Sequence, residues 1–366
     1  MSVDNLRPIK IQDISEQTPF PTFCAPKILG CFSLDSHRKY IEGPEFLKFL
    51  QLSQRDMDVN FDLDKNCVPT DPLEEAKNSQ ETSELVQLLK WIHKHEELFL
   101  SRRPDFVLYR GLMSKILNTP YENRDGWTIG AISKNGTVYL RNIDTPQSKA
   151  QKEEYNANPR LKRMADWGYH FEHFLLSDGL GKSPDPSRQV KEECNIVYAS
   201  KLNNHRILYA AELDGVWCKD GNDVNPKKNP ELLTNCNLIE LKTTRCFPNN
   251  KMTHNFKRFN LRKWWCQSFT ARISDIIVGF RDDEGVVRQV TTMPLNELPK
   301  LGIGWSGSVC FNFLDMFLTE VKRIVGNDAE AVYIFEFTPE FRRKRNYIEI
   351  NVKAEKGSDN MLSNLL

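Results

Sequence analysis

Strand-like patterns dominate the second half of the chain. Apolar or alternating runs at 194–200, 207–217 and 237–243 predict strands, as do the segments DIIVGF, VVRQVTTM, AVYIFEF and NYIEINV. Earlier, the segment GWTIGAISKNGTVYLRNI contains two alternating runs joined by Asn135-Gly136, and an Asn-Gly pair in that position is a strong signal for a β-hairpin. The pattern therefore predicts a protein rich in β-sheet.

Apolar residues repeat at helical spacing in several segments between these strands. This spacing predicts helices at about 84–100, 161–177, 257–272 and 309–326, and a short one in YRGLMSKILN. Gly168 lies on the apolar face of the second of these helices, where its missing side chain would allow close approach to a sheet.

The remaining segments have no clear period. Residues 1–50 mix proline-rich and aromatic pieces and are expected to wrap the surface, and residues 146–160 are expected to form a polar link. The acidic segment 56–83 is predicted to be an exposed loop, and residues 353–366 a disordered tail. Because no linker divides the chain, we interpret residues 1–366 as a single domain.

Composition allows a large core and leaves the class of partner open. The chain has 366 residues, of which 40% are hydrophobic and 10% aromatic, so it can bury a substantial core and is not a disordered protein. The 50 Lys and Arg residues nearly balance the 49 Asp and Glu residues. Binding to a nucleic acid would therefore need a local basic face.

The nine cysteines indicate a reducing compartment. They are odd in number, scattered and never spaced as C-x-x-C, which disfavours both a disulfide scaffold and a zinc site. The first residues contain no apolar signal segment, and no stretch approaches the roughly 18 apolar residues that a membrane span needs. We therefore expect a protein of the nucleus or cytoplasm that does not span a membrane.

Two of the predicted strands carry acidic residues among apolar ones. Glu212 and Asp214 lie two residues apart in RILYAAELDGVW, as do Glu240 and Lys242 in LIELKTT, so each pair is expected to share one face of its strand. Buried carboxylates without partners are unfavourable, and either a divalent cation or salt bridges must compensate them. Carboxylates around Mg²⁺ or Mn²⁺ with a nearby lysine are typical of metal-dependent phosphodiester cleavage. A purely structural set of ion pairs is the alternative.

One predicted helix could supply a further carboxylate. Glu172 follows Phe171 at the edge of the apolar face of helix 161–177, although a surface glutamate is the simpler interpretation. The flanking His170 and His173 match neither H-E-x-x-H nor H-x-x-E-H. We therefore expect these histidines to be packing or surface residues and not zinc ligands.

Basic and aromatic residues alternate in the segment FKRFNLRKWWCQSF. Such a helix could bind a nucleic-acid backbone and stacked bases. The alternative is an amphipathic helix whose aromatic residues belong to the core, which is the favoured interpretation for Trp264 and Trp265. Gln267 could face either way.

Taken in order, these segments resemble one family, the decapping exoribonucleases, which comprise DXO and its Rai-type fungal relatives. The matching pieces are YRGLMSKILNTPYENRDGW with Arg110, GYHFE with Glu172, AELDG with Glu212 and Asp214, IELKT with Glu240 and Lys242, and LRKWWCQSF with Gln267. The segments IVGFRDDEG and WSGSVCFNF agree as well, and the resemblance runs from about residue 20 to about residue 340.

The resemblance implies an α/β (α+β) fold of two mixed, twisted β-sheets with flanking helices, distantly like the PD-(D/E)xK nucleases. It also implies a hydrolase that acts on RNA 5′ ends. Such an enzyme removes incomplete caps, 5′ triphosphate or NAD caps, and then digests the monophosphorylated chain from 5′ to 3′.

The resemblance further implies a role for each matching residue. The metal ligands that it implies for Mg²⁺ or Mn²⁺, with two ions expected, are Glu172, Glu212, Asp214, Glu240 and the carbonyl of Leu241. Lys242 and Gln267 would position the attacking water and the scissile phosphate. Arg110 would bind phosphate, and Glu172 would also face the substrate.

Two other functions stay open at this point. Fungal relatives also support a partner 5′-to-3′ exoribonuclease, so a noncatalytic adaptor that binds RNA ends is the alternative; the complete carboxylate set disfavours it as the sole role. A DNA endonuclease of the wider PD-(D/E)xK group is disfavoured by the segments around Arg110 and Trp264. The resemblance favours the nucleus, whereas RRKR at 342–345 is interpreted as a basic turn and not a localisation signal.

Overall fold

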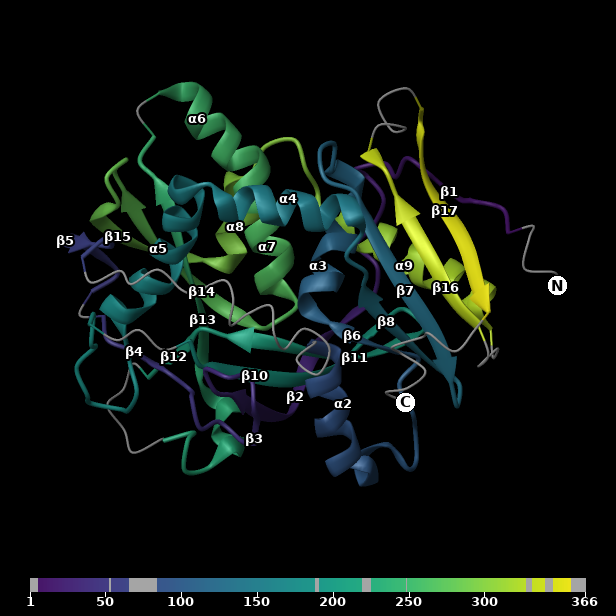
Figure 1. The fold of residues 1–366 in the computed structure, drawn as a ribbon, viewed down its shortest axis with the longest axis horizontal. Coiled ribbons are helices and arrows are strands. Elements are labelled where there is room, and N and C mark those ends of the chain that lie inside the picture. The colour runs from purple at the N-terminus through teal and green to yellow at the C-terminus, as the bar shows by residue number, and fades with distance from the viewer. Residues whose placement is uncertain are drawn as a thin grey trace.

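The computed structural model describes residues 6–52, 54–65, 84–187, 191–218, 225–247, 249–326, 331–339 and 345–356. Within these residues the chain forms two mixed β-sheets with helices between and outside them (Figure 1). None of the described helices combines the length and apolarity that crossing a membrane requires.

The first sheet joins segments from both ends of the chain. Its strand order is β1 (Ile9–Gln12), β17 (Tyr347–Lys356), β16 (Ala331–Phe337), β7 (Trp127–Lys134), β8 (Thr137–Asn142), β6 (Phe106–Tyr109), β11 (His205–Leu213), β10 (Glu193–Leu202), β2 (Phe23–Leu34) and β3 (Tyr40–Glu42). The pairs β6–β8 and β6–β11 are parallel, and the others are antiparallel.

The second sheet combines strands from the first half of the chain with strands that follow β11. Its order is β5 (Asp56–Asp62), β15 (Val286–Pro294), β14 (Ile273–Arg281), β13 (Asn237–Arg245), β12 (Gly215–Trp217), β4 (Phe49–Leu50) and β9 (Leu176–Ser177). The α-helices are α2 (Glu84–Lys94), α3 (Arg110–Asn118), α4 (Pro146–Ala157), α5 (Pro159–Leu175), α6 (Asn250–Asn255), α7 (Leu261–Phe269), α8 (Leu298–Leu301) and α9 (Gly307–Val325).

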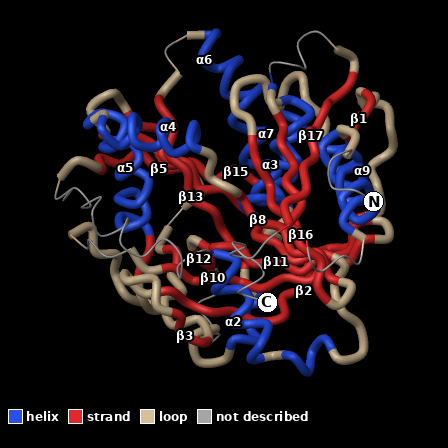
Figure 2. Tube along the Cα trace, turned by 45° about the vertical axis from the view of Figure 1, so that its right-hand side comes forward, coloured by secondary structure: helices blue, strands red, loops and turns tan. Residues whose placement is uncertain are grey.

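The central strands are apolar on both faces because both faces are covered. On β6, Phe106 and Leu108 enter the main core with α3, α7 and α9, whereas Val107 packs with α2 on the opposite face. On β14, Ile276 enters the same main core and Ile277 packs with α5. Continuous apolar runs in the sequence therefore correspond to strands between two helical layers. The two sheets approach each other near β10, β11 and β12 (Figure 2).

The Asn135-Gly136 hairpin is confirmed. Residues Trp127–Lys134 and Thr137–Asn142 pair antiparallel, and Lys134 lies opposite Thr137. Asn135 has φ 54° and Gly136 has φ 79°. Positive φ at both central positions is the requirement of a type I′ turn, which explains the residue choice.

The expected surface wrapping of residues 1–50 is wrong. Strand β1 pairs with β17, and β2 pairs with β10 along most of its length. Ile9 and Ile11 alternate with exposed residues and enter the main core, so the short alternating run in this segment was a strand signal.

Three further boundaries need correction. Residues 146–157 form helix α4 and not a link, with the hydroxyl of Thr145 accepting the N–H of Ser148 at 3.1 Å at the helix start. Residues 56–62 of the predicted loop form β5, because every second side chain faces inward along this edge strand. Residues 353–356 of the predicted tail continue β17 against β16. The rest of both segments, 66–83 and 357–366, lies outside the described residues, as do residues 342–344 of RRKR.

Candidate active site

The chain crosses from one sheet to the other between Glu212 and Gly215. Glu212 is the penultimate residue of β11 in the first sheet, and β12 of the second sheet begins at Gly215. Asp214 lies in this crossover, and its Oδ2 accepts the backbone N–H of Leu241 from β13 at 2.6 Å. The two acidic residues are therefore held where the sheets meet, although they do not belong to one continuous strand.

Glu240 is the most strongly bound carboxylate of the group. It lies on β13 and is only 1% exposed. Its Oε1 accepts hydrogen bonds of 2.6 Å from both Lys242 Nζ and Gln267 Nε2. Its Oε2 lies 3.5 Å from a guanidinium nitrogen of Arg110. The predicted shared face of Glu240 and Lys242 is thus confirmed, and this face also receives side chains from α3 and α7.

Arg110 connects the two sheets at this point. It is the first residue of α3, directly after β6, and is 6% exposed. Besides approaching Glu240, its guanidinium donates to the carbonyl oxygen of Glu212 at 3.3 Å. A cation is therefore placed between the end of β11 and the middle of β13.

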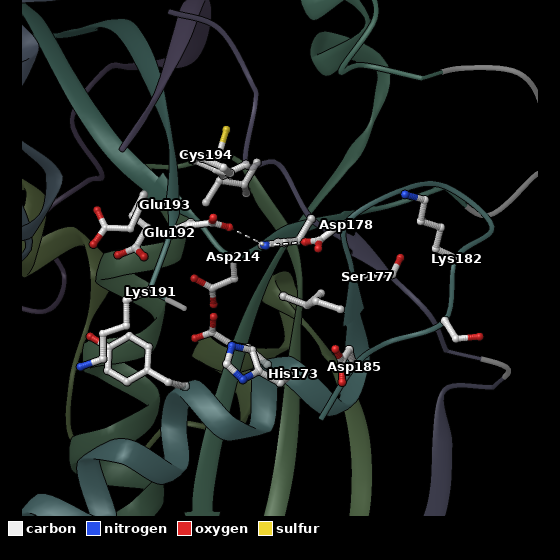
Figure 3. Close-up of a pocket in the computed structure, with 18 residues that line it drawn as sticks. His173, Ser177, Asp178, Lys182, Asp185, Lys191, Glu192, Glu193, Cys194 and Asp214 are labelled. Atoms are coloured by element: carbon white, nitrogen blue, oxygen red, sulfur yellow. Dashed lines mark hydrogen bonds and ion pairs between the residues drawn. The ribbon is translucent and has the colours of Figure 1, made fainter. Parts of the chain in front are cut away.

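Two cavities open onto these residues. Glu172, Glu212 and Asp214 line the first, and Figure 3 shows Asp214 reaching into it from the crossover after β11 and His173 from α5. Arg110, Glu212 and Gln267 line the second. Glu212 therefore borders both cavities and lies between them.

The carboxylates divide into two electrostatic classes. Burial, together with the charges of Asp214 and Glu212, raises the pKa of Glu172 well above its usual range. Burial and the charges of Glu193 and Asp214 do the same to the pKa of Glu212, and burial and the charge of Glu240 raise the pKa of Asp214 to about 7. Carboxylates that lie this close together favour the binding of a cation or a proton.

Glu240 and Lys242 behave in the opposite way. Burial alone would raise the pKa of Glu240, but the charges of Lys242 and Arg110 outweigh it and lower this pKa. Burial would lower the pKa of Lys242, yet the negative charges of Glu240 and Asp214 raise it. The pair is consequently ionised around neutral pH.

The carboxylate oxygens of the site are ligands of the type that a hard divalent cation prefers. They are not yet arranged around a cation position. Glu172, Glu212 and Asp214 offer carboxylate oxygens to a single cavity, and oxygen donors are those that Mg²⁺ and Mn²⁺ prefer. Within the described part of the chain, however, no three His, Cys, Asp or Glu side chains already have a metal-ligating arrangement. In Glu240, both oxygens already face donors from the protein.

Comparison with known families decides the relationship. Residues 24–364 match the family model described as RAI1 like PD-(D/E)XK nuclease. This chain belongs to that family. It is 33% identical over 335 residues to the decapping and exoribonuclease protein of Bos taurus, which covers 88% of this chain and 80% of the relative. It is 32% identical over 335 residues to the protein of that name from Homo sapiens, with 88% and 81% covered.

Solved structures of RAI1-family proteins have the same fold. The structure of Candida albicans Rai1 in complex with pU5-Mn²⁺ superposes with a TM-score of 0.75 at 21% identity, over 98% of this chain and 95% of that one. Scheffersomyces stipitis Rai1 in complex with (3′-NADP)⁺ and calcium ion gives 0.74 at 22% identity, over 95% and 94%. At these identities the likeness concerns the fold alone.

In this RAI1-family chain, Glu172 reaches the cavity by a different route from the one expected. A side chain at Gly168 would meet no atom within 4 Å, so Gly168 does not bring α5 close to the sheet. That role belongs to Gly279 on β14, where an added Cβ would lie 2.6 Å from the ring of Phe171. The glycine that allows α5 to lie close to the sheet is therefore Gly279 of the sheet and not Gly168 of the helix.

The other sequence interpretations can be compared with this RAI1-family site. Trp264 and Trp265 are 8% and 5% exposed in the main core, which confirms their interpretation as core residues. Arg262 is also buried and donates to Asn118 Oδ1 at 2.9 Å, so it is not available as a surface cation. His170 is buried, and His173 is partly buried at the cavity wall.

Several residues of the cavity walls carry no sequence signal. Lys48, Tyr169 and Lys191 line the first cavity and come from different loops and from α5. Lys191 Nζ lies 4.3 Å from the centre of the Tyr169 ring. Glu84, at the start of α2, lines the second cavity. Such residues converge only through the fold, and their spacing along the chain gives no motif that could reveal them.

Proposed function

We propose that this protein is a divalent-metal-dependent hydrolase that removes incomplete, triphosphate and NAD caps from RNA 5′ ends and digests 5′-monophosphate RNA from 5′ to 3′. One observation carries the proposal most strongly. Glu240, held by Lys242 and Gln267, adjoins a cavity lined by three carboxylates whose pKa values are raised. Membership of the RAI1-like nuclease family and relatives named decapping and exoribonuclease protein support the same activity.

The first part of the proposal concerns the cations. The proposed ligands for two Mg²⁺ or Mn²⁺ ions are Glu172, Glu212, Asp214, Glu240 and the carbonyl oxygen of Leu241. When bound, such ions supply positive charge next to the scissile phosphate and lower the pKa of a water molecule. The raised pKa values of the free carboxylates support this assignment, because a divalent cation relieves the repulsion that raises them.

The second part concerns the groups that hold the substrate. We assign to Lys242 and Gln267 the positioning of the attacking water and the scissile phosphate, since both already donate to one oxygen of Glu240. The charge of Lys242 would also stabilise the extra negative charge that develops on phosphorus. Arg110 borders the second cavity and has guanidinium N–H groups beyond those directed to Glu240 and Glu212, with which it would bind phosphate.

A single centre would account for several activities. The bond that is cleaved is always a phosphodiester or a phosphoanhydride, and only the group beyond it differs: a mononucleotide, pyrophosphate or a complete cap. The two cavities that meet at Glu212 provide separate spaces for the leaving group and for the chain that continues in the 3′ direction. Loss of Glu212 should therefore abolish all activities together.

Product analysis by mass spectrometry tests the proposal. Purified protein with Mg²⁺ or Mn²⁺ is incubated with RNAs that carry a 5′ monophosphate, triphosphate, unmethylated cap, methylated cap or NAD. Mononucleotides from the monophosphate RNA and intact released caps are expected, and Glu212→Gln should lose both. Gln289→Ala, at an exposed position of β15, serves as the matched control and should retain them.

The same experiment addresses the remaining parts of the proposal. Activity of the isolated protein would argue against an adaptor that acts only with a partner 5′-to-3′ exoribonuclease. If folded protein binds RNA ends but cleaves no substrate, the adaptor function replaces the enzymatic one. For the compartment we propose the nucleus, in keeping with the reducing compartment that the scattered cysteines, never spaced as C-x-x-C, indicate.

A further inference from the structure

Two cysteines lie opposite each other beside β12 and β13 of the second sheet. Cys218 directly follows β12, and Cys236 directly precedes β13. Strands β12 and β13 pair antiparallel, with Val216 opposite Leu238 and Trp217 opposite Asn237. Continuing this register by one residue places Cys218 opposite Cys236. Directly opposed residues of an antiparallel pair have close Cβ atoms, which is the relation that a disulfide requires.

The two thiols are already in contact. The side chains of Cys218 and Cys236 form a hydrogen bond with each other. Cys236 Sγ also lies 3.3 Å from the carbonyl oxygen of Leu232. Both cysteines are partly exposed, so a small oxidant can reach them.

Another contacting pair provides a comparison within the same protein. Cys266 on α7 and Cys310 on α9 also form a hydrogen bond with each other, but both are fully buried in the main core. Contact alone therefore does not distinguish Cys218 and Cys236. Among the cysteines within the described residues, the pair Cys218 and Cys236 is distinguished because its two side chains are both in contact and partly exposed.

The thiol chemistry agrees with this distinction. The interaction between the two thiols lowers the pKa of Cys218 to about 7 and raises the pKa of Cys236, so the pair shares one thiolate, which lies on Cys218. Burial instead raises the pKa of Cys31 to about 12 and the pKa of Cys194 and Cys266 well above their usual range. Because the thiolate is the reactive form, oxidation should begin at Cys218.

We propose that Cys218 and Cys236 are a redox-active pair that forms a reversible disulfide when the protein meets a hydroperoxide. The Cys218 thiolate attacks one peroxide oxygen, the O–O bond breaks, and hydroxide leaves and is protonated to water. Cys218 is then a sulfenic acid. The sulfur of Cys236 attacks the sulfur of Cys218, the S–O bond breaks, and hydroxide leaves with the proton of Cys236 as a second water molecule. In total, two thiols and one hydrogen peroxide give one disulfide and two water molecules.

The disulfide would join the two strands that enter the site. Cys218 lies four positions after Asp214, and Cys236 lies four positions before Glu240. It would also link the two ends of the connection between β12 and β13, residues 218–236. In this connection Lys227 Nζ donates at 2.7 Å to the carbonyl oxygen of Asp178, a residue of the first cavity wall. Oxidation would therefore restrict a segment that contacts the wall of the cavity.

Peptide mapping of the full-length protein tests the proposal directly. Reduced protein is treated with hydrogen peroxide, free thiols are alkylated, and the protein is digested with trypsin without reduction. Trypsin places Cys218 in peptide 207–219 and Cys236 in peptide 229–242, each with a single cysteine. We expect these two peptides to be joined, with a mass two hydrogens below their sum, and to separate on treatment with dithiothreitol.

The buried pair is the internal control. Its cysteines lie in peptides 264–272 and 301–322, and their cross-link should be less abundant by about ten-fold or more, since both thiols are buried in the core and burial raises the pKa of Cys266. Equal cross-linking of both pairs would contradict the selectivity. Oxidation of Cys218 to a sulfinic acid without linkage, or no oxidation of Cys218 at all, would overturn the proposal.

A variant separates the two chemical steps. In Cys236→Ser the resolving thiol is absent, so the sulfenic acid on Cys218 should persist and react with a cyclic 1,3-dione, whereas Cys218→Ser should not be labelled at peptide 207–219. Thermal unfolding checks that both variants fold. If either does not, the wild-type peptide map still decides. The readout is a mass and not an activity, so the outcome is independent of the proposed nuclease function.

Discussion

The carboxylate of Asp214 accepts the backbone N–H of Leu241 at 2.6 Å, which joins the crossover between the two sheets to the middle of β13. Leu241 is 5% exposed, so its N–H has little access to water. Asp214 therefore has a structural function besides its proposed one as a metal ligand. Removal of this carboxylate should therefore affect the fold as well as the proposed metal site.

Asp214→Ala should destabilise the protein, whereas Asp214→Asn should not. Alanine leaves the buried N–H of Leu241 without an acceptor, at a cost of about 1–3 kcal/mol, whereas the amide oxygen of asparagine can still accept it. Both variants should lose RNA hydrolysis, because neither provides a carboxylate. Urea unfolding of metal-free protein measures the difference in the free energy of unfolding. Equal free energies for the two variants would show that the hydrogen bond contributes nothing.

Glu212→Gln should stabilise the metal-free protein in a pH-dependent way. The pKa of Glu212 is raised in the folded state, so its ionisation opposes folding. Below the unfolded pKa of about 4.3 both states are protonated and the substitution has no electrostatic effect. The cost to the wild type appears as the pH rises above that value and is complete above the folded pKa. The melting temperature of Glu212→Gln should therefore exceed that of the wild type more at pH 8 than at pH 4.

Divalent cations should reverse this order. Bound Mg²⁺ or Mn²⁺ stabilises the folded state in proportion to its affinity, and the wild type offers one more carboxylate than Glu212→Gln. Melting temperatures with a chelator and then with excess Mn²⁺ at pH 8 measure the effect. Glu284→Gln, at an exposed turn position, is the control and should respond to pH and to metal as the wild type does. A metal response of equal size in wild type and Glu212→Gln would remove Glu212 from the proposed ligands.

The alternation of side chains along a strand correctly predicted the part of the site that lies on a single strand. The period of two was sufficient to place Glu240 and Lys242 on the same face, and their 2.6 Å ion pair confirms it. The same rule suggested one strand for Glu212 and Asp214. In the structure β11 ends at Leu213 and the chain enters the other sheet, a step that leaves no trace in hydrophobicity because both strands are buried.

Contacts between distant segments could not be derived in this way. Gln267 donates to Glu240 across 27 positions, and Arg110 approaches Glu240 across 130. In the sequence Gln267 could face either way, since it lies at the boundary of the apolar face of α7. Only packing of α7 between the two sheets determines its direction, and the family resemblance was what identified it as a site residue.

Asp105 should contribute stability that is lost in acid. Its carboxylate accepts hydrogen bonds from Arg206 Nε at 2.8 Å and from Lys322 Nζ at 2.6 Å, which connects β6, β11 and α9. Burial opposes ionisation, but these donors outweigh it and depress the pKa of Asp105 below its usual range. A depressed pKa means that the stabilisation is fully present above the unfolded pKa of about 3.9 and declines as the pH falls toward the folded pKa.

Asp105→Asn tests this assignment. Loss of the charge weakens the hydrogen bonds to two partly exposed cations, and we expect a loss of about 1.5–3 kcal/mol in the free energy of unfolding at pH 7. The difference from the wild type should shrink when both are measured at pH 3. Asp283→Asn removes an exposed ion pair with Arg245 and should change stability by less than about 1 kcal/mol. An equal loss for Asp105→Asn at both pH values would exclude the charge as its cause.

Gln267→Ala should separate catalysis from stability. Its Nε2 is one of two groups that donate to Oε1 of Glu240 at 2.6 Å, and Lys242 still holds that oxygen when the amide is removed. The fold should therefore persist, while loss of a hydrogen bond to a charged group, worth about 1.5–3 kcal/mol, should lower kcat/KM by about ten-fold to a hundred-fold. Hydrolysis of a 5′-monophosphate RNA, followed under single-turnover conditions, measures the effect. Gln289→Ala is again the control, and a Gln267→Ala variant with unchanged kcat/KM would show that this side chain only supports the packing of α7.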